Sequence, residues 1–301
     1  MKRIMDSYCN PPFMLFKEKG RFPSNLTIGY EQECCVRAPY NDDEYRDWRT
    51  VAREEINKHK FLYAKEDCSV EEGGEINTHP FNWNWYRKNH IADYMDILKK
   101  RGVEADSNCG FHVHIGRNFF TDNHLCKMVK FFYANPDFIA KISQRDGKEN
   151  LYEYANPDID VTEMVENSYD PCQHCRKSCD NCEDSYETNP PPKADFNQLH
   201  FCESFVNQYS SEEDRFVALN LCPYKTVEIR IFQGTVNKKL AQAYLEFVVA
   251  CVLYTKKTAF KNVSVRGFKR YVSHYRKLYP YLYRSGLLKG KVQKASYKWA
   301  A

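Results

Sequence analysis

The sequence contains no apolar run long enough to cross a membrane as a helix. Such a span needs about 20 consecutive apolar residues, and no stretch of this 301-residue chain approaches that length. The chain also does not open with the basic segment and apolar core of a secretory signal. We therefore expect a soluble, cytoplasmic protein with no membrane partner.

Glycine is scarce and the net charge is small. There are 12 glycines against 22 tyrosines and 19 phenylalanines, a composition that argues against disorder. The net charge of +4 is too small to require a nucleic-acid partner. A chain of this length can bury a large core by itself. Its 13 cysteines, an odd number, are therefore expected to be thiols in a reducing compartment rather than a disulfide framework.

Acidic residues are absent beyond residue 255, where Lys and Arg alternate with tyrosines. Charge combined with aromatic stacking suits the binding of RNA or DNA. A solvated basic helical face that packs through its tyrosines has the same pattern. We predict a basic, tyrosine-rich helical segment at 256–301, with nucleic acid as a permitted partner that the rest of the sequence does not favour.

The remaining chain divides into an irregular lead-in at 1–25 and a domain at 26–255, which contains a polar, cysteine-rich insertion at 156–195. Strand patterns occupy 26–36, 109–115, 215–221, 225–235 and both ends of 61–80. Helical patterns occupy 44–59, 85–101, 122–135 and 238–255. This mixture predicts an α+β fold with a mainly antiparallel sheet and helices packed on one face.

Three of the strand patterns place ionisable side chains on one face, opposite the apolar residues. The three pairs, from "GYEQE", "CGFHVHI" and "TVEIRIFQGT", are Glu31 and Glu33, His112 and His114, and Glu228 and Arg230. One such pair alone is typical of a partly wet sheet face, but carboxylates are uncommon in strands. Three pairs in one chain predict a functional site.

If these strands are neighbours, their carboxylates would repel one another and have raised pKa values unless cations share the site. Carboxylate-rich ligation suits the hard ions Mg²⁺ and Mn²⁺, which also bind phosphate oxygens, whereas a histidine-dominated set would favour zinc. Arg230 would complement the negative charge of a transferred phosphoryl group. The acidic loop "KEDCSVEEGGEINTHP" turns sharply at its two glycines, and we predict Glu75 after them as a further ligand, with Asp67 as a weaker candidate.

These four motifs, in this order, resemble those of the amidoligases, carboxylate-amine ligases related to glutamine synthetase and glutamate-cysteine ligase. The similarity covers residues 26–255 apart from the insertion. It implies an ATP- and Mg²⁺-dependent enzyme in which a substrate carboxylate attacks the γ-phosphoryl group of ATP and an amine then displaces phosphate from the acyl phosphate. The implied substrates are a small-molecule or peptide carboxylate and an amine, and the implied fold is the antiparallel-sheet fold of those two ligases.

The resemblance also implies roles for individual residues. Glu33, His114 and Arg230 match catalytic positions. His114, Arg230 and, as a looser match, Arg145 would contact the nucleotide. The matched magnesium ligands are Glu31, Glu33, Glu75, His112 and Glu228. Cys68 stands where the family's turn usually has glycine, so the resemblance leaves the placement of the preceding aspartate open.

The insertion contains two Cys-x-x-Cys pairs separated by three residues. Their members are Cys172, Cys175, Cys179 and Cys182. Four thiolates satisfy a closed tetrahedral zinc site, which would order a segment that has no core of its own. Free thiols and an iron–sulfur cluster are the alternatives, and we predict structural zinc.

Three functions are compatible with these features. The first is an ATP-dependent ligase, the second a nucleic-acid-binding protein that uses the basic segment and a zinc module, and the third a metal-dependent hydrolase that uses His112 and His114 with Glu31 or Glu33. ATP turnover that depends on a carboxylate, salt-dependent nucleic-acid affinity, and turnover without nucleotide would distinguish them. The sequence favours the ligase but identifies neither its acid, nor its amine, nor its oligomeric state.

Overall fold

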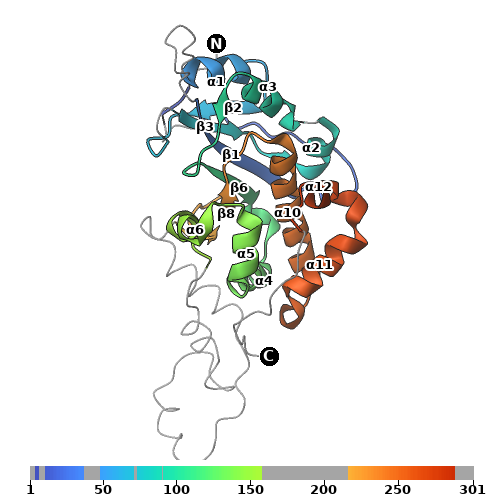
Figure 1. Ribbon diagram of the computed structural model, residues 1–301. Helices are drawn as coiled ribbons and strands as arrows, with labels where there is room; N and C mark the ends of the chain where they lie inside the picture. Colours follow the sequence, from blue (N-terminus) through green and yellow to red (C-terminus); the bar gives the residue numbers. More distant parts are fainter. Residues whose placement is uncertain are drawn as a thin grey trace, which may run out of the picture.

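The computed structural model describes residues 4–6, 11–36, 48–70, 73–89, 91–157 and 216–288 (Figure 1). The four cysteines predicted to bind zinc lie outside the described residues, as does the end of the basic segment from 289 onward. None of the described helices is both long and apolar enough to pass through a membrane.

An antiparallel sheet forms the centre of the fold. Its strands follow the order β2-β3-β1-β6-β8-β7, and β4 and β5 also pair with β1. Their bounds are β1 Thr27–Val36, β2 Leu62–Lys65, β3 Gly73–Thr78, β4 Phe81–Asn82, β5 Val103–Glu104, β6 Gly110–Gly116, β7 Leu219–Asn220 and β8 Thr226–Gln233. Every pairing among these strands is antiparallel, which confirms the α+β class with a mainly antiparallel sheet.

The described residues also form helices. Their bounds are α1 Trp48–Ile56, α2 Trp83–Asn89, α3 Tyr94–Lys100, α4 Asp122–Tyr133, α5 Pro136–Ser143, α6 Gly147–Ala155, α10 Lys238–Lys257, α11 Val265–His274 and α12 Pro280–Arg284. Short 3-10 turns are η2 Ile91–Asp93, η3 Arg117–Phe119, η4 Phe260–Asn262 and η5 Arg276–Leu278. The predicted helices at 122–135 and 238–255 are thus confirmed to within two residues.

The single helix predicted over 85–101 is wrong, because α2, η2 and α3 share that stretch. Trp83 and Tyr86 are the buried residues of α2, and their rings stack with centroids 4.7 Å apart. Ile91 and Ala92 of η2 and Tyr94 at the start of α3 are buried as well. The apolar spacing thus continues through a stretch that the structure divides into separate elements. The sequence analysis also missed α5 and α6.

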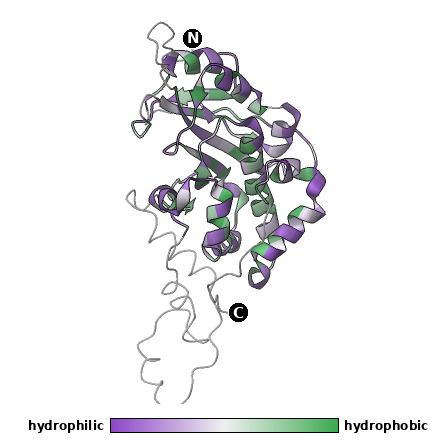
Figure 2. Cartoon of the chain, viewed as in Figure 1, coloured by the Kyte–Doolittle hydropathy of each residue, from purple (hydrophilic) through white to green (hydrophobic). Residues whose placement is uncertain are grey.

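Helix α10 covers the apolar face of the sheet and is buried nearly all round (Figure 1). Phe247 of α10 packs against Phe232 of β8, Phe131 of α4 and Phe268 of α11. Figure 2 shows apolar residues concentrated on α10 and the sheet, while α11 is hydrophilic along much of its length. The described part of the basic segment is therefore helical and lies on the far side of α10 from the sheet.

The N-terminal lead-in is held against β4 although it forms no helix among the described residues. Phe16 N–H donates to Pro80 O, and Asn82 N–H donates to Phe16 O. The Asn82 side-chain amide exchanges two hydrogen bonds with the backbone of Glu18, of 3.1 and 2.9 Å. These contacts hold Lys17 and its neighbours beside the edge of the open sheet face.

Candidate active site on the open sheet face

The predicted ionisable pairs converge on one face of four adjacent strands. Register places the side chains directly across from one another: Glu31 opposite His112, Glu33 opposite Glu75, and His114 opposite Glu228. Residues opposite one another in antiparallel strands have Cβ atoms about 5 Å apart. The structure thus brings the residues of β1, β3, β6 and β8 into one cluster.

His112 lies at the centre of this cluster. Its Nδ1 is 3.5 Å from Glu31 Oε2 and 3.6 Å from Glu228 Oε1, and its Nε2 is 3.7 Å from Glu33 Oε1. The imidazole is buried, with 4 % of its residue surface exposed. One ring therefore contacts carboxylates from both neighbouring strands.

His114 marks the end of the cluster nearest the C-terminal end of β6. Its Nε2 is 3.3 Å from Glu31 Oε1 and 4.0 Å from Glu228 Oε1, and its Nδ1 is 3.2 Å from Thr226 Oγ1. Burial disfavours the charged ring, but the two carboxylates outweigh it and raise the pKa of His114 to about 9. Conversely, despite burial, His114 and His112 hold the pKa of Glu31 well below its usual range.

Glu228 is held from two sides. Arg230 Nη1 donates to Glu228 Oε1 at 2.6 Å, and Asn220 Nδ2 of β7 donates to Glu228 Oε2 at 2.7 Å. Burial opposes the charged forms of both partners, but their pairing lowers the pKa of Glu228 and raises that of Arg230. The Arg230 Nε is buried without a hydrogen-bond partner among the described residues, so this guanidinium keeps a free donor.

A bulge in β8 sets the position of Arg230. Between Phe111 and Val113 on β6 the partner strand advances by three residues, so that Arg230 and Ile231 together oppose His112. The Ile231 carbonyl accepts a hydrogen bond from Arg145 Nε at 3.3 Å. Regular alternation alone does not predict this arrangement.

Arg145 follows α5 and is buried beside the cluster. Its Nη1 donates to Asn150 Oδ1 at 3.1 Å, and its guanidinium lies 5.5 Å from the ring centroid of Tyr154. Burial lowers its pKa, while the nearby charge of Glu33 opposes this effect. Arg145 therefore lies at the Glu33 end of the site.

One backbone N–H group and one lysine side chain hold the carboxylates at the Glu33 end of the cluster. Gly110 N–H donates to Glu33 Oε2 at 2.5 Å. Lys65 Nζ of β2 is 3.9 Å from Glu75 Oε1. Burial and the charge of Glu31 raise the pKa of Glu75 to about 8.

Asp67, the weaker ligand candidate, is not among the described residues that contact the cluster. It accepts hydrogen bonds from the backbone N–H and the hydroxyl of Ser69 in an exposed turn.

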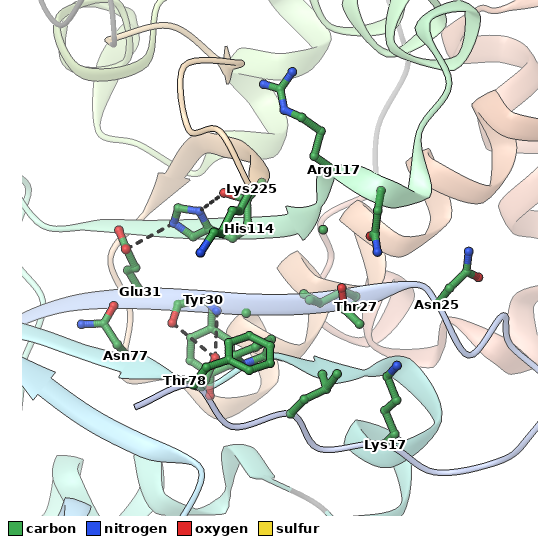
Figure 3. Close-up of a pocket in the computed structure, with 18 of the residues that line it drawn as sticks. Lys17, Asn25, Thr27, Tyr30, Glu31, Asn77, Thr78, His114, Arg117 and Lys225 are labelled. Atoms are coloured by element: carbon green, nitrogen blue, oxygen red, sulfur yellow. Dashed lines mark hydrogen bonds and ion pairs between the residues drawn. The ribbon is translucent and has the colours of Figure 1, made fainter. Parts of the chain in front are cut away.

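A pocket of about 730 Å³ opens beside the other end of the cluster (Figure 3). Glu31 and His114 lie at one end of it, and Lys17 and Asn25 lie at the other. The remaining cationic lining comes from Arg117 and Lys225, and the exposed apolar lining comes from Phe13, Leu15 and Tyr224. Neither Arg230 nor Arg145 lines this pocket.

The sequence analysis missed several residues that support the cluster. Those that donate to or contact its members are Lys65, Gly110, Asn220 and Thr226. It also missed the pocket wall formed by the lead-in. The asparagine of "RFVALNL" is Asn220, and its presence in a buried strand could have indicated a polar partner nearby, because buried amides are usually hydrogen-bonded.

The family described as "putative amidoligase enzyme" matches residues 26–252. The chain belongs to this family. The match spans all four motifs of the cluster and ends within α10, so the resemblance seen in the sequence is confirmed and the protein is assigned to a family of ligase-type enzymes. No curated protein is significantly similar to the chain.

Proposed function

We propose that this amidoligase-family protein is an ATP-dependent carboxylate-amine ligase that forms an amide through an acyl phosphate. The observation that carries the proposal is the cluster of four glutamates, two histidines and one arginine, of which Glu31 and His114 also line one end of the 730 Å³ pocket. Such a cluster suits phosphoryl transfer, which requires positioning and charge neutralisation more than a strong base. We also propose that the antiparallel sheet is of the type found in glutamine synthetase and glutamate-cysteine ligase.

The donor set fits a divalent cation. One ligand atom each from Glu31, His114 and Glu228 lies within 4.8 Å of the others. Carboxylate oxygens with a single imidazole suit Mg²⁺ or Mn²⁺. For a second ion the nearest donors would be Glu33, His112 Nε2 at 3.7 Å from its Oε1, and Glu75 opposite Glu33 on β3. Bound there, the cations would neutralise phosphate charge and hold the phosphoryl group in line.

The pocket suits the nucleotide. Lys17, Arg117 and Lys225 supply positive charge for a polyphosphate. Phe13 and Tyr224, which are 77 % and 89 % exposed, line this pocket and supply aromatic faces on which a base would stack. ATP lying along this pocket would direct its γ-phosphoryl group toward Glu31 and His114.

Arg230 would act on the phosphoryl group in transfer. Its Nη1 is held by Glu228, and the guanidinium, with 15 % of its side chain exposed, would complement the negative charge of a phosphoryl group. Arg145, at the far end of the cluster, would face the carboxylate substrate rather than the nucleotide. In the transfer itself the substrate carboxylate oxygen bonds to the γ-phosphorus while the bond to ADP breaks, and the amine nitrogen then displaces phosphate from the acyl carbon.

The test is phosphate release from ATP with Mg²⁺ or Mn²⁺ across a panel of amino-acid, peptide and cell-wall carboxylates, each with and without amines. We expect release that depends on one acid and one amine and falls by about 10²–10³-fold in Arg230→Ala and in Glu33→Gln. Glu149→Gln, an exposed carboxylate on α6, is the matched control and should behave as wild type. Hydrolysis of an amide without nucleotide would instead support a metal-dependent hydrolase.

A second candidate function, nucleic-acid binding, is favoured by the surface of α11, η5 and α12. Two hollows of about 670 and 860 Å³ share His274 and Tyr275. Their other charged lining residues are Arg21, Arg266, Arg270, Arg276, Lys277 and Arg284, and no carboxylate lines either hollow. Since no large apolar side chain of these helices is exposed, the surface suits phosphates and bases better than a lipid bilayer.

Binding of a labelled single-stranded RNA or DNA across a salt series tests this function. The double variant Arg266→Glu and Arg270→Glu should weaken binding and reduce the slope of log affinity against log salt by about 1.4, since two phosphate contacts are lost. The matched control reverses two exposed cations on α3, Lys99→Glu and Lys100→Glu. Equal weakening in both pairs would mean that only net charge matters, and no site exists on α11.

A further inference from the structure

A second group of metal-ligating side chains lies beyond Glu33, at the end of the open face. Cys35 and Cys109 are both free and buried, and one donor atom from each lies within 4.8 Å of a carboxylate oxygen of Asp106. The two sulfurs also lie within 4.8 Å of each other. The proposed function uses none of these three residues.

Hydrogen bonds fix the turn that carries two of the donors. Asp106 Oδ1 accepts from the backbone N–H groups of Asn108 and Cys109 at 2.9 and 3.1 Å. Gly234 N–H donates to the Cys109 carbonyl at 2.7 Å, and Gln233 Nε2 donates to the same oxygen at 3.1 Å. The second carboxylate oxygen of Asp106 accepts no hydrogen bond from the described residues. The donors are therefore held before any ion binds.

The surroundings of the sulfurs are apolar on one side and open on the other. Val70 and Ala105 pack against Cys35 and Cys109 in a small cluster separate from the main core. Asp106 is exposed to solvent. An ion could therefore enter past the carboxylate and reach two sulfurs shielded from water.

We propose that Cys35, Cys109 and Asp106 form a site for a thiophilic divalent cation, of which Zn²⁺ is the natural occupant. Two thiolates and one carboxylate supply three of the four ligands of tetrahedral zinc and leave one position for water or another donor. Thiolates select against Mg²⁺, so this site and the carboxylate cluster would bind different ions. Each thiol loses its proton to solvent when the cation binds.

The site has a consequence for the carboxylate cluster. Cys109 precedes Gly110, whose N–H holds Glu33, and Cys35 is two residues beyond Glu33 on β1. A cation bridging these cysteines would tie the end of β1 to the start of β6. We therefore expect the ion to stabilise the strand pair on which Glu33 lies.

Cobalt spectroscopy under reducing conditions tests the proposal. The full chain is first changed to serine at Cys172, Cys175, Cys179 and Cys182, which removes the other cysteine-rich segment. Co²⁺ added to this variant should give a thiolate-to-cobalt charge-transfer absorption that saturates at about one ion per chain and disappears when Zn²⁺ replaces it. The carboxylate and histidine cluster contains no sulfur, so it cannot produce this band.

Further substitutions in that background locate the ion. Cys35→Ser and Cys109→Ser should each weaken Co²⁺ binding about tenfold or more and reduce the band. Asp106→Asn should weaken binding while keeping the two-thiolate intensity, and it lies at the surface, where folding is not at risk. Cys34→Ser, the neighbouring buried thiol outside the group, is the matched control and should keep the band. Absence of a thiolate band in the background variant, or a band unchanged by both cysteine substitutions, would overturn the proposal.

Discussion

At the scale of single residues, the site depends on a glycine that contributes no side chain. A Cβ at Gly110 would lie 2.5 Å from His112 Nε2 and 3.3 Å from Arg145 Nη2. Gly110→Ala should therefore displace His112. Phosphate release that depends on the acid and the amine should fall by about 10²-fold, the loss expected when a site residue is misplaced by roughly 1 Å. Phosphate release and Mn²⁺ affinity are the measurements, with thermal unfolding to show that the fold is retained.

Gly267→Ala is the steric control, because its Cβ would crowd Tyr254 Oη at 2.3 Å, on α11 and behind α10. This variant should unfold at a lower temperature but bind Mn²⁺ as wild type does. If Gly110→Ala also retained its Mn²⁺ affinity, His112 would not be held by close packing against this glycine.

Alternation along strands predicted which side chains face the site, because period-2 geometry is a local property of the backbone. The partners of those side chains come from other strands: Asn220 of β7 reaches Glu228, and Lys65 lies directly opposite Glu75 on β2. The β8 bulge that sets Arg230 depends on the pairing with β6. A sequence read without its pairing partners does not contain that information.

At the scale of elements, a buried carboxylate joins α10 to α12. Glu246 Oε2 accepts from the backbone N–H groups of Tyr281 and Leu282 at 2.7 and 3.0 Å. Burial raises its pKa from about 4.5 to about 8 despite these bonds. Between these two values the folded state holds a proton that unfolding releases, so Glu246 makes the protein less stable as pH rises from about 5 to 8.

Glu246→Gln should therefore remove part of this pH dependence and stabilise the protein at pH 8 by roughly 2 kcal/mol relative to wild type. Chemical denaturation at pH 5, 6.5 and 8 measures the difference between variant and wild type. The exposed Glu149→Gln should follow the wild-type curve at every pH. If the free energy of unfolding of Glu246→Gln changed with pH in parallel with that of wild type, Glu246 would not hold a proton at neutral pH.

Helix α10, which begins at Lys238 shortly after β8 ends at Gln233, has a side-chain cap at its N-terminus. Asn237 Oδ1 accepts from the N–H groups of Lys239 and Leu240 at 3.0 and 3.3 Å. Asn237→Ala should lower the free energy of unfolding by about 1 kcal/mol, whereas Asn237→Asp should retain it. Denaturant unfolding measures both. Equal losses in the two variants would mean that the cap bond contributes nothing.

The helical elements differ in how far sequence predicts them. Caps and long periodicity delimit α4 and α10, and their predicted ranges agree with the structure. The stretch from α2 to α3 has an uninterrupted helical pattern, but Ile91 and Ala92 are buried where it breaks. Burial against other elements decides such cases, since propensity is only a weak local preference.

At the scale of the whole molecule, the site joins the two ends of the domain. Its ionisable residues begin on β1 at Glu31 and end on β8 with Glu228 and Arg230, with β6 between these strands in the sheet. A ligand that contacts all three strands binds only when the sheet is assembled, so its binding free energy adds to the stability of the entire fold. Thermal unfolding therefore reports on the cluster without any knowledge of the acid or amine.

MgATP at about 100 times its dissociation constant should stabilise the protein by about 2.7 kcal/mol, which corresponds to a rise in unfolding temperature of roughly 5 °C. Glu31→Gln should lose most of this rise, because Glu31 contacts both histidines and lines the pocket. Lys225→Ala should reduce it by weakening polyphosphate binding, with Lys99→Ala on α3 as the matched control. An equal rise in Glu31→Gln and wild type would place the nucleotide elsewhere, since a ligand bound away from β1 would not depend on this carboxylate.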